Sequence, residues 1–211
     1  MNKRNSIKRL SFTAIFAAIS TILYCYVKFP LPIFPSFLDV NFSMIPIIIC
    51  TFMLGPWDAC VCVILRCLLK WILPPGTGTQ YVGELADVLI GLAAVIPAGL
   101  IYHKSNSKHK TLFAFIAVAA CWVGMAIISN IFINIPWFTH LYFGGNQAPL
   151  VGICNTAFEV ISFGKIQAST DSFMVCYVFL AVIPFNLMLA LMVILITAPI
   201  HKRIKVLYDM I

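Results

Sequence analysis

Residues 173–199 read FMVCYVFLAVIPFNLMLALMVILITAP, a stretch of 27 residues without one charged side chain. A helix needs roughly 20 mainly apolar residues to cross the hydrocarbon core of a bilayer. This segment is therefore predicted to span a membrane. The whole chain has the same character, because 62% of its 211 residues are hydrophobic and only 10% are charged. So few polar side chains cannot cover a water-soluble globule, and the composition predicts an all-α polytopic membrane protein.

Five further apolar segments, separated by proline, glycine or charged residues, predict helices in the rest of the chain. They cover about 7–27, 40–54, 58–73, 81–101 and 112–135. Together with 173–199 they predict six transmembrane helices. No polar stretch is long enough to form a separate core, so residues 1–211 are predicted to be a single membrane domain.

The basic residues form three short clusters in a chain of formal net charge +7. The clusters are Lys3, Arg4, Lys8 and Arg9, then Lys104, Lys108 and Lys110, and finally Lys202, Arg203 and Lys205. They do not follow one face as a phosphate footprint would, so no nucleic-acid partner is predicted. After six crossings all three lie on one side of the bilayer. The positive-inside rule makes that side cytoplasmic, and with it both termini.

The connections predicted on the opposite side are 28–39, 74–80 and 136–172. The first, KFPLPIFPSFLD, contains three prolines, which forbid a helix, and three phenylalanines, which are costly to expose. We therefore expect it to fold back over the helices as a cap. The fairly apolar segment 149–166 is expected to form a helix at the membrane interface.

Charged residues within predicted membrane segments are costly and are default functional candidates. Arg66 and Lys70 share one helix face, and Glu84 and Asp87 begin the next helix. Opposite signs on adjacent helices predict a pair. The pair is either a bridge that only satisfies Arg66 or part of a ligand-contacting or coupling site. As an alternative, Arg66, Glu84 and Asp87 could form the proton relay of a stand-alone secondary transporter.

Three asparagines occur in predicted helices near the outer side. Asn130 and Asn134 are four residues apart and share one face, and Asn186 follows Pro184. Carboxamides donate and accept hydrogen bonds, which suits a flat heterocycle with alternating carbonyl and N–H groups. Aromatic residues of the outer connections predict the walls of this pocket: Phe34, Phe37, Trp137 and Phe138. The alternative is that the asparagines only hold helices together.

The motifs of several enzyme classes are absent from the sequence. It contains no GxxxxGK[ST] phosphate loop, no HExxH and no GxSxG, and its four histidines lack ligand spacing. Eight cysteines form no CxxC pair and are expected to be buried thiols. No metal, cofactor or enzymatic activity is predicted. A membrane enzyme or redox protein that uses Cys60 and Cys62 is the third hypothesis.

Several motifs resemble, in the same order, the substrate-binding S components of energy-coupling factor (ECF) transporters, and among them the riboflavin-specific subunits. The Pro-rich first loop of those subunits and the entry to their second helix are matched in this chain by FPLPIFPSFLDVNFSMIP (29–46). The third helix of those subunits, which has a basic residue at the position of Arg66, is matched by GPWDACVCVILRCLLKWIL (55–73). Their fourth helix is matched by VGELADVLIG (82–91). The ends of the fifth and sixth helices of those subunits are matched by ISNIFINIP (128–136) and IPFNLMLAL (183–191).

This resemblance implies a six-helix S component in a prokaryotic plasma membrane. Riboflavin would bind near the outer face beneath the first loop, as a transported ligand and not as a cofactor. The implied partners are a transmembrane coupling subunit and two ATPase subunits. Ala14 and Ala18, a small-xxx-small pair, would contact the coupling subunit. The candidate substrate-binding residues are Asn41, Phe37, Glu84, Asp87, Asn130, Asn134, Trp137 and Asn186.

Three positions depart from the family's pattern. Leu189 occupies the lysine position of an Asn-x-x-Lys motif that begins here at Asn186. Met44 replaces an aspartate, and Asp87 replaces an asparagine. A modified flavin or another planar vitamin is therefore an alternative substrate.

Overall fold

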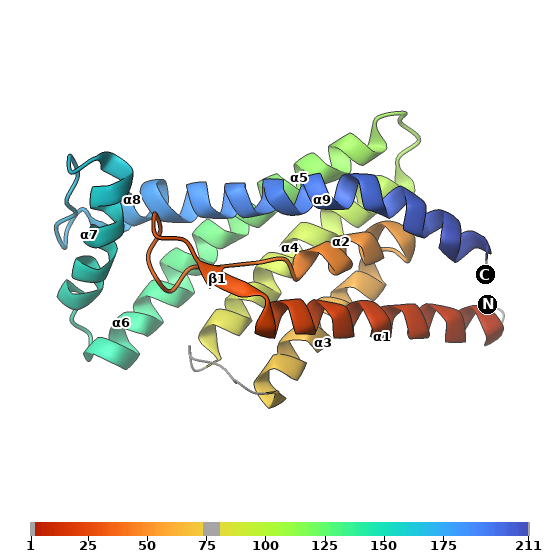
Figure 1. The fold of residues 1–211 in the computed structure, drawn as a ribbon, viewed down its shortest axis with the longest axis horizontal. Helices are drawn as coiled ribbons and strands as arrows, with labels where there is room; N and C mark the ends of the chain where they lie inside the picture. Colours follow the sequence, from red (N-terminus) through yellow and green to blue (C-terminus); the bar gives the residue numbers. More distant parts are fainter. Residues whose placement is uncertain (1–2, 74–80, 211) are drawn as a thin grey trace.

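A computed structural model describes residues 3–73 and 81–210 of the chain. Its helices form one elongated bundle (Figure 1). Each of the six predicted segments contains a helix, although the one predicted from residue 40 begins only at Met44. The helices are α1 (Lys3–Tyr26), α2 (Met44–Met53), α3 (Pro56–Ile72), α4 (Val82–Lys104), α5 (Lys110–Ser129), and α8 (Phe173–Tyr177) leading into α9 (Ile183–Met210). The start of α1, the α4–α5 connection and the end of α9 lie at the same end of the bundle. The predicted connection 74–80 lies outside the described residues.

Four helical stretches are long and apolar enough to cross a membrane. They are Ser6–Tyr26, Val82–Lys104, Lys110–Phe143 and Phe173–His201. This confirms a mainly helical protein with membrane-spanning character. The helix α2 has only ten residues and α3 has 17. The count of six crossings therefore stays a prediction.

The fifth helix ends later than the sequence predicts. We expected an end near residue 135, before Pro136, but the helix continues to Phe143 as α6 (Ile135–Phe143). A π-helical turn, η1 (Asn130–Asn134), precedes the proline, and the Ile135 N–H donates to the Asn130 carbonyl five residues back. The extra residue in this turn moves away the carbonyl that the proline ring would otherwise strike. The same arrangement recurs at η2 (Val178–Val182), two residues before Pro184.

The Pro-rich loop 28–39 folds back against the helices, as predicted. Its ends form two short antiparallel strands, β1 (Lys28–Pro30) and β2 (Asp39–Asn41), with Phe29 opposite Val40. These strands depart from a purely helical prediction, because extended Pro-rich chain can pair where it cannot form a helix. Between them Phe34 is buried edge-on against the Phe185 ring, with 5.3 Å between ring centroids.

The segment predicted at 149–166 forms the helix α7 (Ala148–Ser162). It lies at the end of the bundle opposite the termini (Figure 1). Phe163 and Gly164 end it in the left-handed region, and the Gly164 N–H donates to the Glu159 carbonyl at 2.8 Å. The helix is confirmed, whereas its place at the membrane interface stays a prediction.

Two glycines let α4 approach α3 closely. A Cβ at Gly91 would lie 2.9 Å from Val63 Cγ1, and a Cβ at Gly99 would lie 2.7 Å from Pro56 Cβ. The proline ring cannot rotate away, so α4 would have to shift. This contact fixes the distance between the two helices that supply most of the charged residues of the cavity described below.

We expect Gly99→Ala to destabilise the protein by about 1–3 kcal/mol, because the added methyl group overpacks this contact. Thermal unfolding in detergent, followed by the exposure of buried thiols to a fluorogenic maleimide, measures the effect. Gly124→Ala in α5 is the control, since a Cβ there meets nothing within 4 Å and alanine favours a helix over glycine by about 1 kcal/mol. Equal melting temperatures in the two variants would contradict the close approach.

Candidate ligand-binding site

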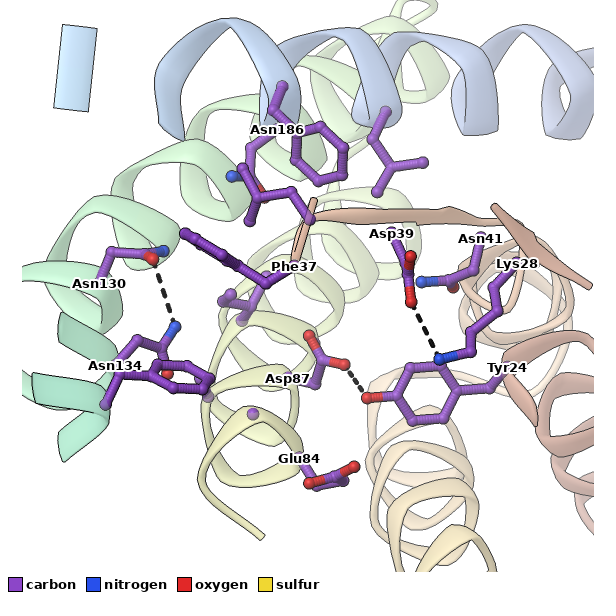
Figure 2. Close-up of a pocket in the computed structure, with 18 of the residues that line it drawn as sticks. Tyr24, Lys28, Phe37, Asp39, Asn41, Glu84, Asp87, Asn130, Asn134 and Asn186 are labelled. Atoms are coloured by element: carbon purple, nitrogen blue, oxygen red, sulfur yellow. Dashed lines mark hydrogen bonds and ion pairs between the residues drawn. The ribbon is translucent and has the colours of Figure 1, made fainter. Parts of the chain in front are cut away.

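A cavity of about 600 Å³ lies beneath the 28–39 loop, among α1, α3, α4, η1, α6 and α9. Seven of the eight candidate substrate-binding residues line it: Phe37, Asn41, Glu84, Asp87, Asn130, Asn134 and Asn186. Arg66 and Lys70 line it as well. Figure 2 shows Asn130, Asn134 and Asn186 on one side of this cavity and the charged residues, together with Asn41, on the other. We call these two sides the amide end and the charged end.

Trp137 is the candidate that the structure does not bring to the cavity. Its side chain is 51% exposed, and the neighbouring Phe138 lines the cavity instead. We expected both residues in a loop, where either could turn inward. In the helix α6 neighbouring side chains point about 100° apart, so only one of the two faces the cavity.

The amide end consists of Asn130, Asn134 and Asn186, with Tyr177 and Trp122 beside them. The Asn130 Oδ1 accepts hydrogen bonds from the Tyr177 hydroxyl at 3.0 Å and from Asn134 Nδ2 at 3.4 Å. The Asn186 Oδ1 accepts one from Trp122 Nε1 at 3.1 Å. The buried Asn134 Oδ1 has no hydrogen-bond partner among the described residues. These contacts fix the orientation of each amide and leave polar atoms for a ligand.

The asparagine side chains also bond to their own helices. Asn130 Nδ2 donates to the Ala126 carbonyl, and Asn186 Nδ2 donates to the Val182 carbonyl, each at 2.8 Å. Each amide nitrogen carries two hydrogens, so one hydrogen of each remains for another acceptor. Both asparagines lie at or just after a π-helical turn, a feature frequent at functional sites.

The charged end contains an ion pair between adjacent helices, as the sequence predicts. Lys70 Nζ of α3 lies 2.7 Å from Glu84 Oε1 of α4, and the Glu84 side chain is 1% exposed. Lys70 Nζ also lies 4.0 Å from the centroid of the Tyr24 ring, and the Tyr24 hydroxyl donates to Asp87 Oδ2. Of the two cations on this face of α3, Lys70 is therefore the one that pairs with Glu84.

Arg66 is 2% exposed and has different neighbours. Its Nη1 donates to Ser43 Oγ at 2.8 Å, and its guanidinium carbon lies 4.7 Å from the Tyr24 ring centroid. The Ser43 hydroxyl in turn donates to Asn41 Oδ1 at 2.7 Å. Arg66 thus connects α3 to α1 and to the chain between β2 and α2.

Sequence reasoning missed three residues that shape the site: Tyr24, Trp122 and Tyr177. Each lies within a long apolar run and looks like an ordinary membrane side chain. A buried hydroxyl or indole N–H requires a partner, however, and this requirement could have pointed to them. Lys28 and Asp39, which pair at 2.9 Å where β1 meets β2, were also missed.

The remaining candidates lie away from the cavity. Ala14 and Ala18 are both exposed on α1. Across the described part of the chain no three His, Cys, Asp or Glu side chains come together as a metal site. All eight cysteines are free thiols, and in α7 burial raises the pKa of Cys154 to about 12.

A helical bundle with four apolar membrane-length helices and a cavity walled by amides and charges defines a membrane protein that binds a small solute. The chain matches the family described as ECF transporter, substrate-specific component, over residues 8–201, and it belongs to that family. It is therefore a membrane-embedded substrate-binding component of a transporter, and the family is not one of enzymes.

The proteins similar to it include two riboflavin transporters and a solved S component. Riboflavin transporter RibU of Staphylococcus aureus (strain TCH60) is 23% identical over 197 residues, which cover 93% of this chain and 90% of the relative. Riboflavin transporter FmnP of Bacillus subtilis (strain 168) is 26% identical over 137 residues, which cover 64% of this chain and 72% of the relative. The structure of the S component of a bacterial ECF transporter matches with a TM-score of 0.68 and 22% identity, over 94% of this chain and 96% of that one. This last likeness shows the fold.

We expect Lys70→Met to destabilise the protein by about 3–5 kcal/mol, because it leaves the buried Glu84 carboxylate without its cation. The double variant Lys70→Met/Glu84→Gln should recover a large part of that loss. Thermal unfolding in detergent compares the two, with Lys108→Met at an exposed lysine as the control. Strictly additive losses from the two substitutions would mean that the pair contributes no coupling energy.

Proposed function

We propose that this protein is the riboflavin-binding S component of an ATP-driven ECF importer. The observation that carries the proposal is the group of three carboxamides at the amide end of the cavity, in a chain of this family whose relatives include riboflavin transporters. The ring system of a flavin has an edge of alternating carbonyl and N–H groups. The free hydrogens of Asn130 and Asn186 suit its carbonyls, and the Asn134 Oδ1 suits its N–H.

Aromatic side chains support a flat ligand at the same place. Phe37 of the loop lies 6.0 Å from Phe138 of α6 and 6.2 Å from Tyr177, measured between ring centroids. Phe138 in turn stacks on Tyr142 at 5.6 Å. Phe37, Phe138 and Tyr142 all line the cavity. A planar ring system would pack against these faces while the asparagines read its polar edge.

We place the cavity at the outer face of the membrane and both termini in the cytoplasm, with six crossings. The three basic clusters belong to the segments at the other end of the bundle, which the positive-inside rule makes cytoplasmic. The short helix α2 does not cross alone. The second crossing would be completed by β2, which pairs with β1 and whose Val40 is fully buried, so that its backbone groups are satisfied within the protein.

We further propose that a coupling subunit and two ATPase subunits energise this chain. The sequence has no phosphate loop of its own. Ala14 and Ala18 lie exposed one turn apart on α1, where small side chains permit a partner helix to approach closely. In this arrangement the chain captures the ligand and its partners supply the energy.

The purified protein should bind riboflavin at one site, measured by the quenching of flavin fluorescence. Asn130→Leu and Asn186→Leu should each weaken binding by about 1–3 kcal/mol, because polar ligand atoms lose their partners. The control is Asn106→Leu in the exposed α4–α5 connection. Wild-type affinity in both variants would move the pocket elsewhere. Tight binding of another planar vitamin instead of riboflavin would keep the class and change the substrate.

Ala14→Trp and Ala18→Trp should leave riboflavin affinity unchanged and reduce association with the coupling subunit, because an indole prevents close approach of the two helices. Co-purification with a co-expressed ECF module measures association. Leu195→Trp is the control, since Leu195 is a large exposed residue on α9. Normal complexes of both alanine variants would refute docking at this face. Uptake by vesicles that contain this chain alone, abolished by loss of the proton gradient, would instead indicate a secondary transporter.

A further inference from the structure

The charged end of the cavity carries as many acidic as basic side chains. Among the lining residues the cations are Lys28, Arg66 and Lys70, and the anions are Asp39, Glu84 and Asp87. Residues 74–80, PPGTGTQ, contain no charged side chain, so they do not alter this balance. The formal charge of the cavity wall is zero in a chain whose overall charge is +7. The excess of positive charge therefore lies elsewhere on the protein.

The lysines of the cavity wall are both paired with carboxylates. Lys70 pairs with the buried Glu84 at 2.7 Å, and Lys28 pairs with Asp39 at 2.9 Å. Withdrawing Lys70 from Glu84 would leave a buried carboxylate unpaired, which costs several kcal/mol. Lys70 is thus not available to a ligand without a large loss, whereas the charge of the part-exposed Lys28 is offset by the neighbouring Asp39.

The charge of the third cation, Arg66, is balanced by the Asp87 carboxylate at the hydroxyl of the Tyr24 ring. Its guanidinium lies against the ring and bonds to Ser43, while the hydroxyl of the same ring donates to Asp87. An anion that approached Arg66 from the cavity would also approach the Asp87 and Glu84 carboxylates. At the amide end the family's lysine position is Leu189, a buried apolar residue of the cavity wall. No lining residue at that end carries a positive charge.

We propose that the charged end binds the polyhydroxyl chain of an uncharged flavin and excludes the phosphate ester of that flavin. The proposal rests on the function proposed above. Hydroxyl groups both donate and accept, so they can bond to Glu84, Asp87 and Lys70 together without breaking the ion pair. A phosphate monoester carries a charge of about −1.5 to −2 at neutral pH and has only acceptors to offer the carboxylates. The charge balance therefore makes the site specific for the unphosphorylated ligand.

The test compares riboflavin with riboflavin 5′-phosphate, titrated separately into the purified full-length protein and followed by flavin fluorescence. We expect the phosphate ester to bind at least about 100-fold more weakly than riboflavin, the equivalent of roughly 2.7 kcal/mol. Comparable affinities would overturn the exclusion while leaving the proposed function intact. Failure to bind either flavin would overturn the proposed function itself.

Removing one carboxylate from the charged end should relax this selectivity. In Glu84→Gln the Lys70 ammonium loses its carboxylate, so the ratio of the two affinities should fall by at least about tenfold. Asp39→Asn removes the carboxylate partner of Lys28 in the same way at a half-exposed position. This variant replaces Glu84→Gln in the test if Glu84→Gln folds poorly. Glu159→Gln on α7 is the matched control, because it removes the same charge from an exposed residue outside the cavity wall. An unchanged ratio in both cavity variants, or an equal fall in the control, would refute the role of the local charge balance.

Discussion

The structure depends on the need to compensate charged groups at membrane depth. A carboxylate or guanidinium away from water is costly unless other groups compensate it. The protein meets this need around the ring of Tyr24, which contacts Lys70 and Arg66 on its faces and Asp87 at its hydroxyl. Because these groups come from α1, α3 and α4, their compensation sets how the three helices lie relative to one another. The glycine contacts between α3 and α4 bring the helices close enough for the Lys70–Glu84 pair. The ion pair and the close packing are thus parts of one constraint.

The amide end relies on a different device, the interruption of regular helices. Each π-helical turn lies just before a proline and lets the helix continue past it. Asn130, within the first of these turns, and Asn186, four residues after the second, line the same cavity from two elements of the bundle. Both asparagines bond to a carbonyl of the preceding turn and so have fixed orientations before any ligand arrives. A fixed amide loses little side-chain entropy on binding, which favours affinity.

The sequence predicted the helices well because their signal is long and local. Six apolar runs and the position of the Pro-rich cap could be inferred from composition and from the chemistry of proline. The amide face at Asn130 and Asn134 followed from helical periodicity. What could not be predicted depends on contacts between distant segments. The partner of Glu84 is Lys70 and not Arg66, because Arg66 lies beside Ser43 and Tyr24, residues of other elements. Trp137 was misplaced for a related reason. A proline normally ends a helix, and no local sequence signal predicted the π-helical turn that lets this helix continue past Pro136.

The helix α1 links the cavity to the face that we propose for the coupling subunit. Tyr24 lies in the cavity wall near one end of α1, and Ala18 lies six residues before it, a rise of about 9 Å along the helix axis. At the other end Arg9 pairs with Asp58 and donates to the Leu54 carbonyl at 3.1 Å, so α1 is joined to the α2–α3 turn as well as to the charged end. A helix fixed at both ends moves as one body with its neighbours. A ligand that strengthens the contacts around Tyr24 would therefore stabilise the position of Ala14 and Ala18 without any change in the face that these two residues form.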